Sequence, residues 1–449
     1  MKNLSDKFID NVCAFSQLDY SSDLLLHARK CLLDYLAATL AGSKEYFPVE
    51  KAFLRSPISS GNTSSIIKHG VKTSPAIAAL VNGISSHAVE LDDGQRFGNI
   101  HPGAPVVSSI LAIGEANNLK IKDIWRGLLT GYESTLRLAC SMQPGHKLKG
   151  FHATGPCGTV GATMGIAALL GFNRLQFKAS LSAACTSASG ILEMIEGDTQ
   201  MMPYNAGKAA SNAVVSAVIG YSGFKTPDDA LGGKRGFLHC FADDVRYELL
   251  TDFDDSHYCT TNYFKPYAAC GHCHASIEAA LRIRNKRRLS LESIRKIDIQ
   301  TYKLALQGHD HTIISGVNSA RMSIPYSAVV ALVKGSAGID DFNEDAIKDS
   351  SILDLVSRVT VRENKALSLQ APAKRMAIMT VFTDDEVISE TVDYPKGQPE
   401  NPMSLDDILN KFYECGHSVG VEDSCLNRIK ELVLETDSSP IRDLMNCLL

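Results

Sequence analysis

The segment HATGPCGTVGATMGIAALLGF, residues 152–172, sets the character of the first half of this chain. It carries no charged side chain and is long enough to raise the question of membrane insertion. However, it contains five glycines, a proline, three threonines and a histidine among small residues. We therefore predict a helix buried in protein, entered through a glycine-rich turn, and no membrane span.

The neighbouring segments extend this pattern into a helical bundle. Residues 23–43 place apolar side chains at helical spacing, with Asp23 as the predicted N-cap and Gly42 near the end. Further helices, mostly rich in alanine, glycine and serine, are predicted at 75–86, 106–118, 121–141, 159–171, 176–193 and 206–223. Small side chains let helices approach closely, so we expect a multi-layer bundle. Strand signals are almost absent before Phe224.

The pattern changes after about residue 258. Residues that alternate or are rich in β-branched side chains predict strands at 295–306, 359–362, 375–382 and 386–392. Helices are predicted among them at 275–284 and 326–334, and residues 404–449 return to helical spacing. A chain of 449 residues also favours two domains. The expected fold class is mainly α, with a large all-helical domain and a smaller α+β domain.

Composition limits the partners of the protein. The chain has 45 Lys and Arg against 50 Asp and Glu, a net charge of -5, and no long basic run. This excludes the usual electrostatic footprint for nucleic acid or an anionic membrane and favours a small-molecule ligand. The twelve cysteines are scattered, and the N-terminus lacks the apolar core of a signal peptide. We expect reduced thiols and a cytoplasmic location.

The segment HAVELDDGQRFGNIHPG, residues 87–103, concentrates ionisable side chains between two apolar helices. Its members are His87, Glu90, Asp92, Asp93, Arg96 and His101. His87 and Glu90 are three residues apart and are predicted to share a helix face, where a carboxylate can orient an imidazole and keep it basic. Alternatively, Asp92 and Asp93 form a solvated pair at a helix end and the histidines belong to the core. The density of ionisable groups favours catalysis.

A second candidate is KGFHATGPCGT, residues 149–159, where His152 precedes the glycine-rich entry to a helix. The backbone N–H groups of a first helical turn suit a carboxylate. A plain turn with a capping threonine and an incidental imidazole explains the segment equally well. The lysine and the spacing of a phosphate-binding loop are both missing.

A third candidate is YFKPYAACGHCH, residues 263–274. Cys270 and Cys273 with interleaved histidines suggest zinc, but no second ligand pair follows and adjacent side chains do not all turn towards one ion. We therefore expect no metal, and we interpret His309-Asp310-His311 as a surface loop. Lys265 is better placed to hold an anionic substrate through a charge-assisted contact, although a solvated lysine is commoner.

Two weaker candidates are arginines. Arg137, and Arg321 in the segment 319–326 that ends at Tyr326, could each clamp a carboxylate bidentately, although helical pairing with Glu133 explains Arg137 without a ligand. The absence of GxSxG, HExxH and GxGxxG weakens hydrolase, metalloprotease and dinucleotide-binding interpretations.

Five segments together resemble the MmgE/PrpD family in order and spacing: HAVELDDGQRFGNIHPG, GFHATGPCGTVGATMGIAALLGF, MPYNAGKAA, FKPYAACGHCHASIEAA and ARMSIPYSAVVALVKG. Each segment alone is weak, but the combination is specific and covers nearly the whole chain. The resemblance implies an all-helical domain of residues 1–264 completed by 396–449, and an α+β lid domain of residues 265–395. It also implies a homodimer without a cofactor.

The family's chemistry, as the resemblance implies, is proton removal beside a carboxylate. Loss of water, loss of carbon dioxide or reprotonation on the other face follows, as in 2-methylcitrate dehydratase, cis-aconitate decarboxylase and iminodisuccinate epimerase. The acidic position of the decarboxylase pocket falls on Glu90, its two histidines on His101 and His152, and the lysine before the proline–tyrosine turn on Lys265. These four are the expected catalytic residues.

The chain departs from the family pattern at three positions. The pocket threonine falls near Gly94, a pocket lysine on Met202 and a further histidine on Cys270. Met202 removes a positive charge, which argues against a cis-aconitate decarboxylase unless Arg96 or Lys208 replaces that charge.

The leading hypothesis is a carbon–oxygen lyase resembling 2-methylcitrate dehydratase, acting on a small di- or tricarboxylate, in which His101 or His152 moves the proton. The alternatives are an epimerase of a dicarboxylate such as iminodisuccinate, a cis-aconitate decarboxylase-like lyase, and a non-catalytic relative that binds a polycarboxylate. The candidate substrate-binding residues are Asp92, Arg96, Arg137, Cys270, Arg321 and Tyr326.

Overall fold

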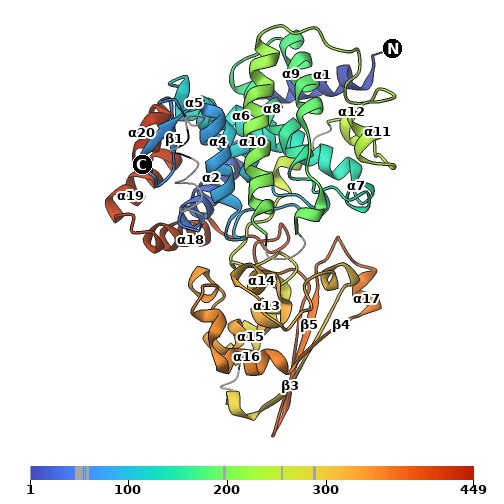
Figure 1. The fold of residues 1–449 in the computed structure, drawn as a ribbon, viewed down its shortest axis with the longest axis vertical. Helices are drawn as coiled ribbons and strands as arrows, with labels where there is room; N and C mark the ends of the chain where they lie inside the picture. Colours follow the sequence, from blue (N-terminus) through green and yellow to red (C-terminus); the bar gives the residue numbers. More distant parts are fainter. Residues whose placement is uncertain are drawn as a thin grey trace. The chain divides into compact units, whose positions relative to one another are not determined.

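A computed structural model describes residues 2–45, 54, 56, 60–195, 199–253, 256–286 and 290–449 (Figure 1). The chain divides into two compact units. The first comprises Met1–Ala88, Asp92–Asn262 and Leu405–Leu449, and the second comprises Val89–Leu91 and Tyr263–Ser404. The short piece Val89–Leu91 therefore belongs with the second unit, whereas its sequence position placed it in the helical domain.

The first unit is helical. Its main helices are α1 (Leu4–Ser16), α2 (Ser22–Gly42), α4 (Pro75–His87), α5 (Gly103–Ala116), α6 (Ile121–Met142), α8 (Pro156–Leu169), α9 (Arg174–Ser187), α10 (Met201–Tyr221), α18 (Leu405–Ser418), α19 (Asp423–Leu434) and α20 (Ile441–Asn446). Short helices are α7 (Gly145–Leu148), α11 (Phe237–Phe241) and α12 (Glu248–Thr251). These confirm the predicted helices. The predicted cap Asp23 is wrong, because Ser21 precedes α2 and its side chain accepts from the Leu24 N–H.

Helix α8 occupies the middle of this unit, and every residue from Pro156 to Ala168 is buried. It packs against α6 and α10, and α10 also packs against α4. A Cβ at Gly165 would lie 2.6 Å from the Gly127 carbonyl oxygen of α6, so the α6–α8 crossing requires a residue without a side chain. No helix among the described residues is both long and apolar enough to span a bilayer.

The C-terminal helices, red in Figure 1, lie beside the early blue helices of the same unit. Helices α18 and α19 pack on α2, and α20 packs on α5. The ammonium of Lys411 on α18 lies 2.5 Å from the carboxylate of Asp34 on α2, and both side chains are buried. A small antiparallel hairpin, β1 (Ser64–Ile66) with β2 (Val71–Thr73), completes the unit. The sequence analysis did not predict it, because a strand of three residues is too short to show a periodic pattern.

The second unit is an α+β unit around a four-stranded sheet in the order β4-β3-β5-β6. Strand β3 (Ile294–Thr301) runs parallel to β4 (Val359–Glu363) and antiparallel to β5 (Ala377–Thr383), which pairs with β6 (Val387–Val392). Helix α13 (His274–Lys286) packs on β5 and β6, followed by α15 (Ile324–Lys334) and then α16 (Ser350–Ser357) (Figure 1). Shorter helices are α14 (Val317–Met322) and α17 (Lys365–Ser368).

Candidate active site

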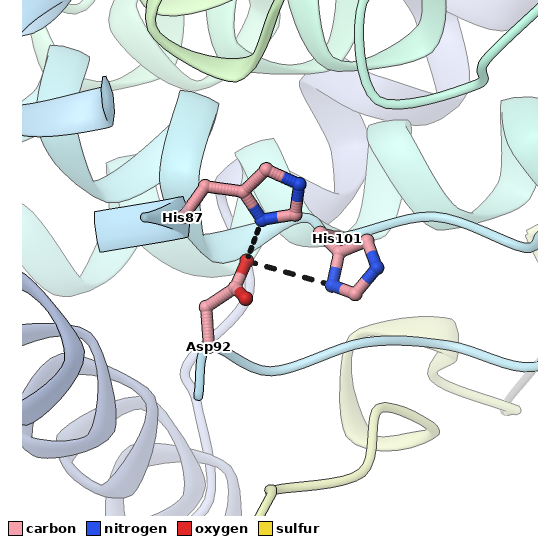
Figure 2. Close-up of side chains that lie close together, drawn as sticks. All are labelled: His87, Asp92 and His101. Carbon is pink, nitrogen blue, oxygen red and sulfur yellow. Dashed lines mark hydrogen bonds and ion pairs between the residues drawn. The ribbon is translucent and has the colours of Figure 1, made fainter. Parts of the chain in front are cut away.

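The carboxylate of Asp92 lies between two imidazoles in the helical unit (Figure 2). Asp92 Oδ2 lies 2.7 Å from His87 Nδ1 and 3.4 Å from His101 Nδ1, and the two rings are 4.7 Å apart between centroids. The His87 side chain is 0% exposed and that of Asp92 is 2% exposed, whereas that of His101 is 18% exposed. His101 is therefore the imidazole of this group that a small molecule can reach.

The predicted pairing of His87 with Glu90 on one helix face is wrong. Helix α4 ends at His87, and Glu90 adopts a left-handed backbone with φ 54°. Since a left-handed residue cannot continue a right-handed helix, Glu90 leaves the helix direction and His87 finds its carboxylate in Asp92 instead. A non-glycine residue in this conformation is uncommon and is typical of functional sites.

The hydrogen bonds of His101 fix which ring nitrogen is basic. His101 Nδ1 lies 2.8 Å from the backbone carbonyl oxygen of Asp93. A carbonyl oxygen only accepts, so Nδ1 carries the proton and Nε2 is the nitrogen that can take one. The Asp92 carboxylate, also next to Nδ1, would stabilise the imidazolium formed when Nε2 is protonated.

Asp93 shapes the loop that carries His101. Its Oδ1 accepts from the Gly103 N–H at 2.9 Å and its Oδ2 accepts from Asn262 Nδ2 at 2.7 Å. A Cβ at Gly103 would lie 2.6 Å from Asp93 Oδ1, so only glycine permits this contact. Both Asp92 and Asp93 are 2% exposed, which makes the alternative of a solvated pair wrong. Burial, aided by the charges of Asp34 and Asp92, raises the pKa of Asp93 to about 7.

The contacts of His152 place its ring proton on Nε2, whereas those of His101 place it on Nδ1. The backbone N–H of His101 donates to Thr154 Oγ1 at 3.2 Å, which joins the segment that carries His101 to the segment that carries His152 within the helical unit. Asn205 Nδ2 lies 3.2 Å from His152 Nδ1, and Asn205 Oδ1 lies 3.1 Å from the Lys208 ammonium. An ammonium only donates, so it orients the Asn205 amide with its NH₂ group towards His152. His152 Nδ1 then accepts, and the proton resides on Nε2.

His87, Asp92 and His101 also have the composition of a metal site, with their ligand atoms all within 4.8 Å of one another. Nδ1 of each histidine forms a hydrogen bond to an oxygen at 2.7–2.8 Å, so with these contacts in place only the Nε2 atoms could bind an ion. The same contacts orient the imidazoles for proton transfer.

The second unit contains a buried ion pair. The Lys265 ammonium lies 2.9 Å from Glu90 Oε2, and the two side chains are 0% and 9% exposed. The alternative of a solvated surface lysine is therefore wrong. Lys265 already has a carboxylate partner, so a substrate carboxylate would share or displace Glu90 at this ammonium.

Three predicted binding residues have structural roles. The Arg137 guanidinium contacts Glu133 at 2.5 Å, as the alternative proposed, and also donates to the Asp252 and Ser256 carbonyls. In the second unit, buried Arg321 donates to the Phe342 carbonyl, and the fully buried Tyr326 hydroxyl donates to the Asp341 carbonyl. These side chains are occupied by protein groups, which removes the basis for assigning them to a carboxylate.

The other predicted positions remain compatible with a site. Arg96 is 8% exposed, and its guanidinium carbon lies 4.9 Å from the centroid of the Phe97 ring. Cys270 is partly buried, and its sulfur lies 3.9 Å from His309 Nε2. Residues 309–311 lie outside any helix or strand, with Asp310 exposed and His309 half-buried, which fits the predicted surface loop. His309 is nevertheless held in place, because its Nδ1 donates to the Met322 carbonyl at 3.0 Å.

Sequence reasoning missed the residues that orient the imidazoles. Asn205 lies 53 positions from His152, and Asn262 lies 169 positions from Asp93. Neutral amides attract no attention in a search for ionisable clusters. For Asn205 a signal existed, since it stands in MPYNAGKAA, one of the five segments that carried the family resemblance, together with Lys208.

The chain thus joins a large helical unit holding oriented imidazoles to a smaller α+β unit with a buried lysine, and family comparison agrees with this two-part organisation. Residues 7–250 match the MmgE/PrpD N-terminal domain and residues 267–436 match the MmgE/PrpD C-terminal domain. The chain belongs to the MmgE/PrpD family.

Several characterised relatives align over most of this chain. A cis-aconitate decarboxylase of Aspergillus terreus is 25% identical over 96% of this chain and 93% of its own length. The cis-aconitate decarboxylase-like protein oryM of Aspergillus oryzae is 25% identical over 97% of this chain and 95% of its own length. The cis-aconitate decarboxylase of Homo sapiens is 22% identical over 92% of this chain and 87% of its own length.

We predict that Asp93 makes stability fall as pH rises towards neutrality. Its pKa is about 7 in the folded protein against 3.8 as the ordinary value, so between these values only the folded state holds the proton. Each pH unit in this window should lower the free energy of unfolding by up to about 1.4 kcal/mol. Urea denaturation at pH 5, 6 and 7 measures this slope. Asp93→Asn should flatten it, whereas Asp19→Asn, at an exposed aspartate, should not; equal slopes in all three proteins would contradict the assignment.

We also predict that Lys265→Met destabilises the second unit by about 3–5 kcal/mol, because it leaves the Glu90 charge buried without its ammonium. Glu90→Gln in the same chain should recover much of this loss. Lys286→Met is the matched control, since Lys286 pairs with Glu390 but its side chain is 64% exposed, and it should cost at most about 1 kcal/mol. Denaturant unfolding followed by fluorescence compares these four proteins and the single variant Glu90→Gln, and an additive double variant would count against a coupled pair.

Proposed function

We propose that this protein is a lyase that acts on a small di- or tricarboxylate by proton transfer beside a carboxylate. His101 is the base, His152 is the acid, and Lys265 holds a carboxylate of the substrate. The observation that carries the proposal is the different partner of each Nδ1 atom: that of His101 lies 2.8 Å from the Asp93 carbonyl oxygen, and that of His152 lies 3.2 Å from Asn205 Nδ2. From these partners we infer an unprotonated Nε2 on His101 and an Nε2–H on His152.

This pair fits the elimination of water, the reaction suggested by the resemblance to 2-methylcitrate dehydratase. His101 Nε2 would remove the proton beside the carboxylate, and His152 Nε2–H would protonate the departing hydroxyl group. An ammonium at the carboxylate stabilises the enediolate-like charge that develops between these steps. The assignment of Lys265 to the same substrate rests on the family resemblance of the segment that contains it.

Decarboxylation of a cis-aconitate-like tricarboxylate is the second candidate, and the names of the relatives favour it. Loss of carbon dioxide leaves a carbanion that needs a proton donor but no base, a role that His152 alone can fill. The positive charge missing at Met202 has a candidate substitute in Lys208, six residues further along helix α10 and joined to His152 through Asn205. Burial lowers the pKa of Lys208 to about 8, so the ammonium is charged at neutral pH.

The deciding experiment incubates the protein with citrate, 2-methylcitrate and cis-aconitate in deuterated water. Ultraviolet absorbance reports new double bonds, released carbon dioxide reports decarboxylation, and NMR reports deuterium incorporation. An alkene without carbon dioxide supports dehydration, and carbon dioxide supports the second candidate. A panel of dicarboxylates is tested in the same way, and deuterium incorporation without a new alkene would indicate epimerisation. Binding without turnover would indicate a non-catalytic relative. Either result would overturn the assignment as a lyase. His101→Gln should lower kcat about 10²–10⁴-fold, unlike His239→Gln at an exposed histidine.

We predict that Asn205→Asp inverts the proton position on His152. A carboxylate only accepts, so His152 Nδ1 must donate to it, and Nε2 then loses the proton that the acid step requires. The expected result is a fall in kcat of about 10²–10⁴-fold. Asn212→Asp is the matched control, because Asn212 also lies on α10 and its amide donates to the Ser187 carbonyl. That variant should lose stability but keep its kcat; equal kcat losses would contradict the role of Asn205.

A further inference from the structure

Two cysteines of the second unit share one tight turn. Cys270-Gly271-His272-Cys273 immediately precedes α13, and the Cys273 N–H donates to the Cys270 carbonyl at 2.8 Å. A four-residue turn closed in this way places its first and last Cα atoms within about 7 Å. Disulfides span Cα separations of about 4.4–6.8 Å, so the backbone is already arranged for a bond between these two sulfurs.

The two thiols have contrasting environments. Cys270 is partly exposed, and its sulfur faces Nε2 of His309, whose Nδ1 donates to the Met322 carbonyl. His309 therefore presents an accepting nitrogen to the thiol. Burial alone would raise the pKa of Cys270, but the charge of His309 and its hydrogen bond outweigh burial and hold the pKa below its usual value. Cys273 is fully buried, and burial, reinforced by Cys270, raises the pKa of its thiol well above the usual value.

The surroundings favour thiol chemistry over metal binding. His272 directs Nδ1 to the Tyr302 hydroxyl at 2.5 Å, and its ring stacks on His309 with centroids 5.1 Å apart. Among the described residues, the cysteines and histidines of this turn form no set with the spacing of metal ligands. A Cβ on Gly271 would lie 3.0 Å from Arg375 Nη1, so a guanidinium also borders the turn and favours a thiolate there.

We propose that Cys270 and Cys273 form a thiol–disulfide exchange site, in which Cys270 attacks small disulfides such as oxidised glutathione and Cys273 closes an internal bond. In the first step the Cys270 thiolate forms a mixed disulfide and one glutathione thiolate leaves, taking the proton that His309 received from Cys270. In the second step the Cys273 thiol loses its proton and attacks the Cys270 sulfur, and the second glutathione leaves as a thiol. The dithiol loses two electrons and oxidised glutathione gains them.

The first test uses the unmodified full-length protein. Limiting iodoacetamide at pH 7 should alkylate Cys270 about tenfold faster than Cys240, an exposed cysteine of the other unit that serves as an internal reference. In glutathione buffers of increasing oxidation, the peptide containing Cys270 and Cys273 should lose the mass of two hydrogens and regain it with dithiothreitol. Equal alkylation rates together with no such mass change would overturn the proposal.

Three variants separate the roles of the residues. Cys273→Ser should trap one glutathione on Cys270, because the resolving thiol is missing. Cys270→Ser should abolish both the adduct and the internal bond, and His309→Asn should bring the alkylation rate of Cys270 down to that of Cys240. Cys240→Ser is the control and should leave the glutathione adduct, the internal bond and the absolute alkylation rate of Cys270 unchanged. An internal bond that still forms in Cys270→Ser, with another cysteine, would contradict the assignment. None of these measurements requires the proposed lyase activity.

Discussion

The contact on which the catalytic interpretation depends is the Asp92 carboxylate shared by His87 and His101. Asp92 is 2% exposed, and its carboxylate lies 2.7 Å from His87 Nδ1 and 3.4 Å from His101 Nδ1, so it holds the two rings close together. The two rings differ in exposure, because the His87 side chain is fully buried whereas the His101 side chain is partly exposed. In the proposed reaction, His87 therefore acts on its neighbour through Asp92, and His101 is the ring assigned to the substrate.

In the proposed reaction, a neutral neighbour decides whether each imidazole is the acid or the base. The Asp93 carbonyl sets the tautomer of His101, and the Asn205 amide sets that of His152. The amide is itself oriented by Lys208, which also donates to the carbonyl and hydroxyl of Ser189. A chain of polar contacts therefore gives the two imidazoles the opposite orientations of donor and acceptor that the proposed reaction requires.

The sequence reveals the long helices and the sheet strands because their apolar periodicity repeats over enough residues, as in α2 and β5. It also identifies residues 87–103 by their density of ionisable side chains, and it offers His152 and Lys265 as separate candidates in two later segments. It does not reveal that Glu90 leaves the helix, since a left-handed residue without glycine has no compositional signature. Nor does it reveal the partners of Asn205 and His309, which come from distant segments joined only by the folded backbone.

The assignment of Val89–Leu91 to the second unit has a consequence for how this architecture can be inherited. A genetic exchange that replaced residues 263–404 as one cassette would import a new lysine at position 265 but retain the old residue at position 90. The incoming ammonium would then meet a foreign partner inside a dry interior, where a mismatch of charge is severely penalised. Modular recombination at the obvious boundaries is therefore disfavoured, and the two halves are expected to diversify by gradual, paired replacement.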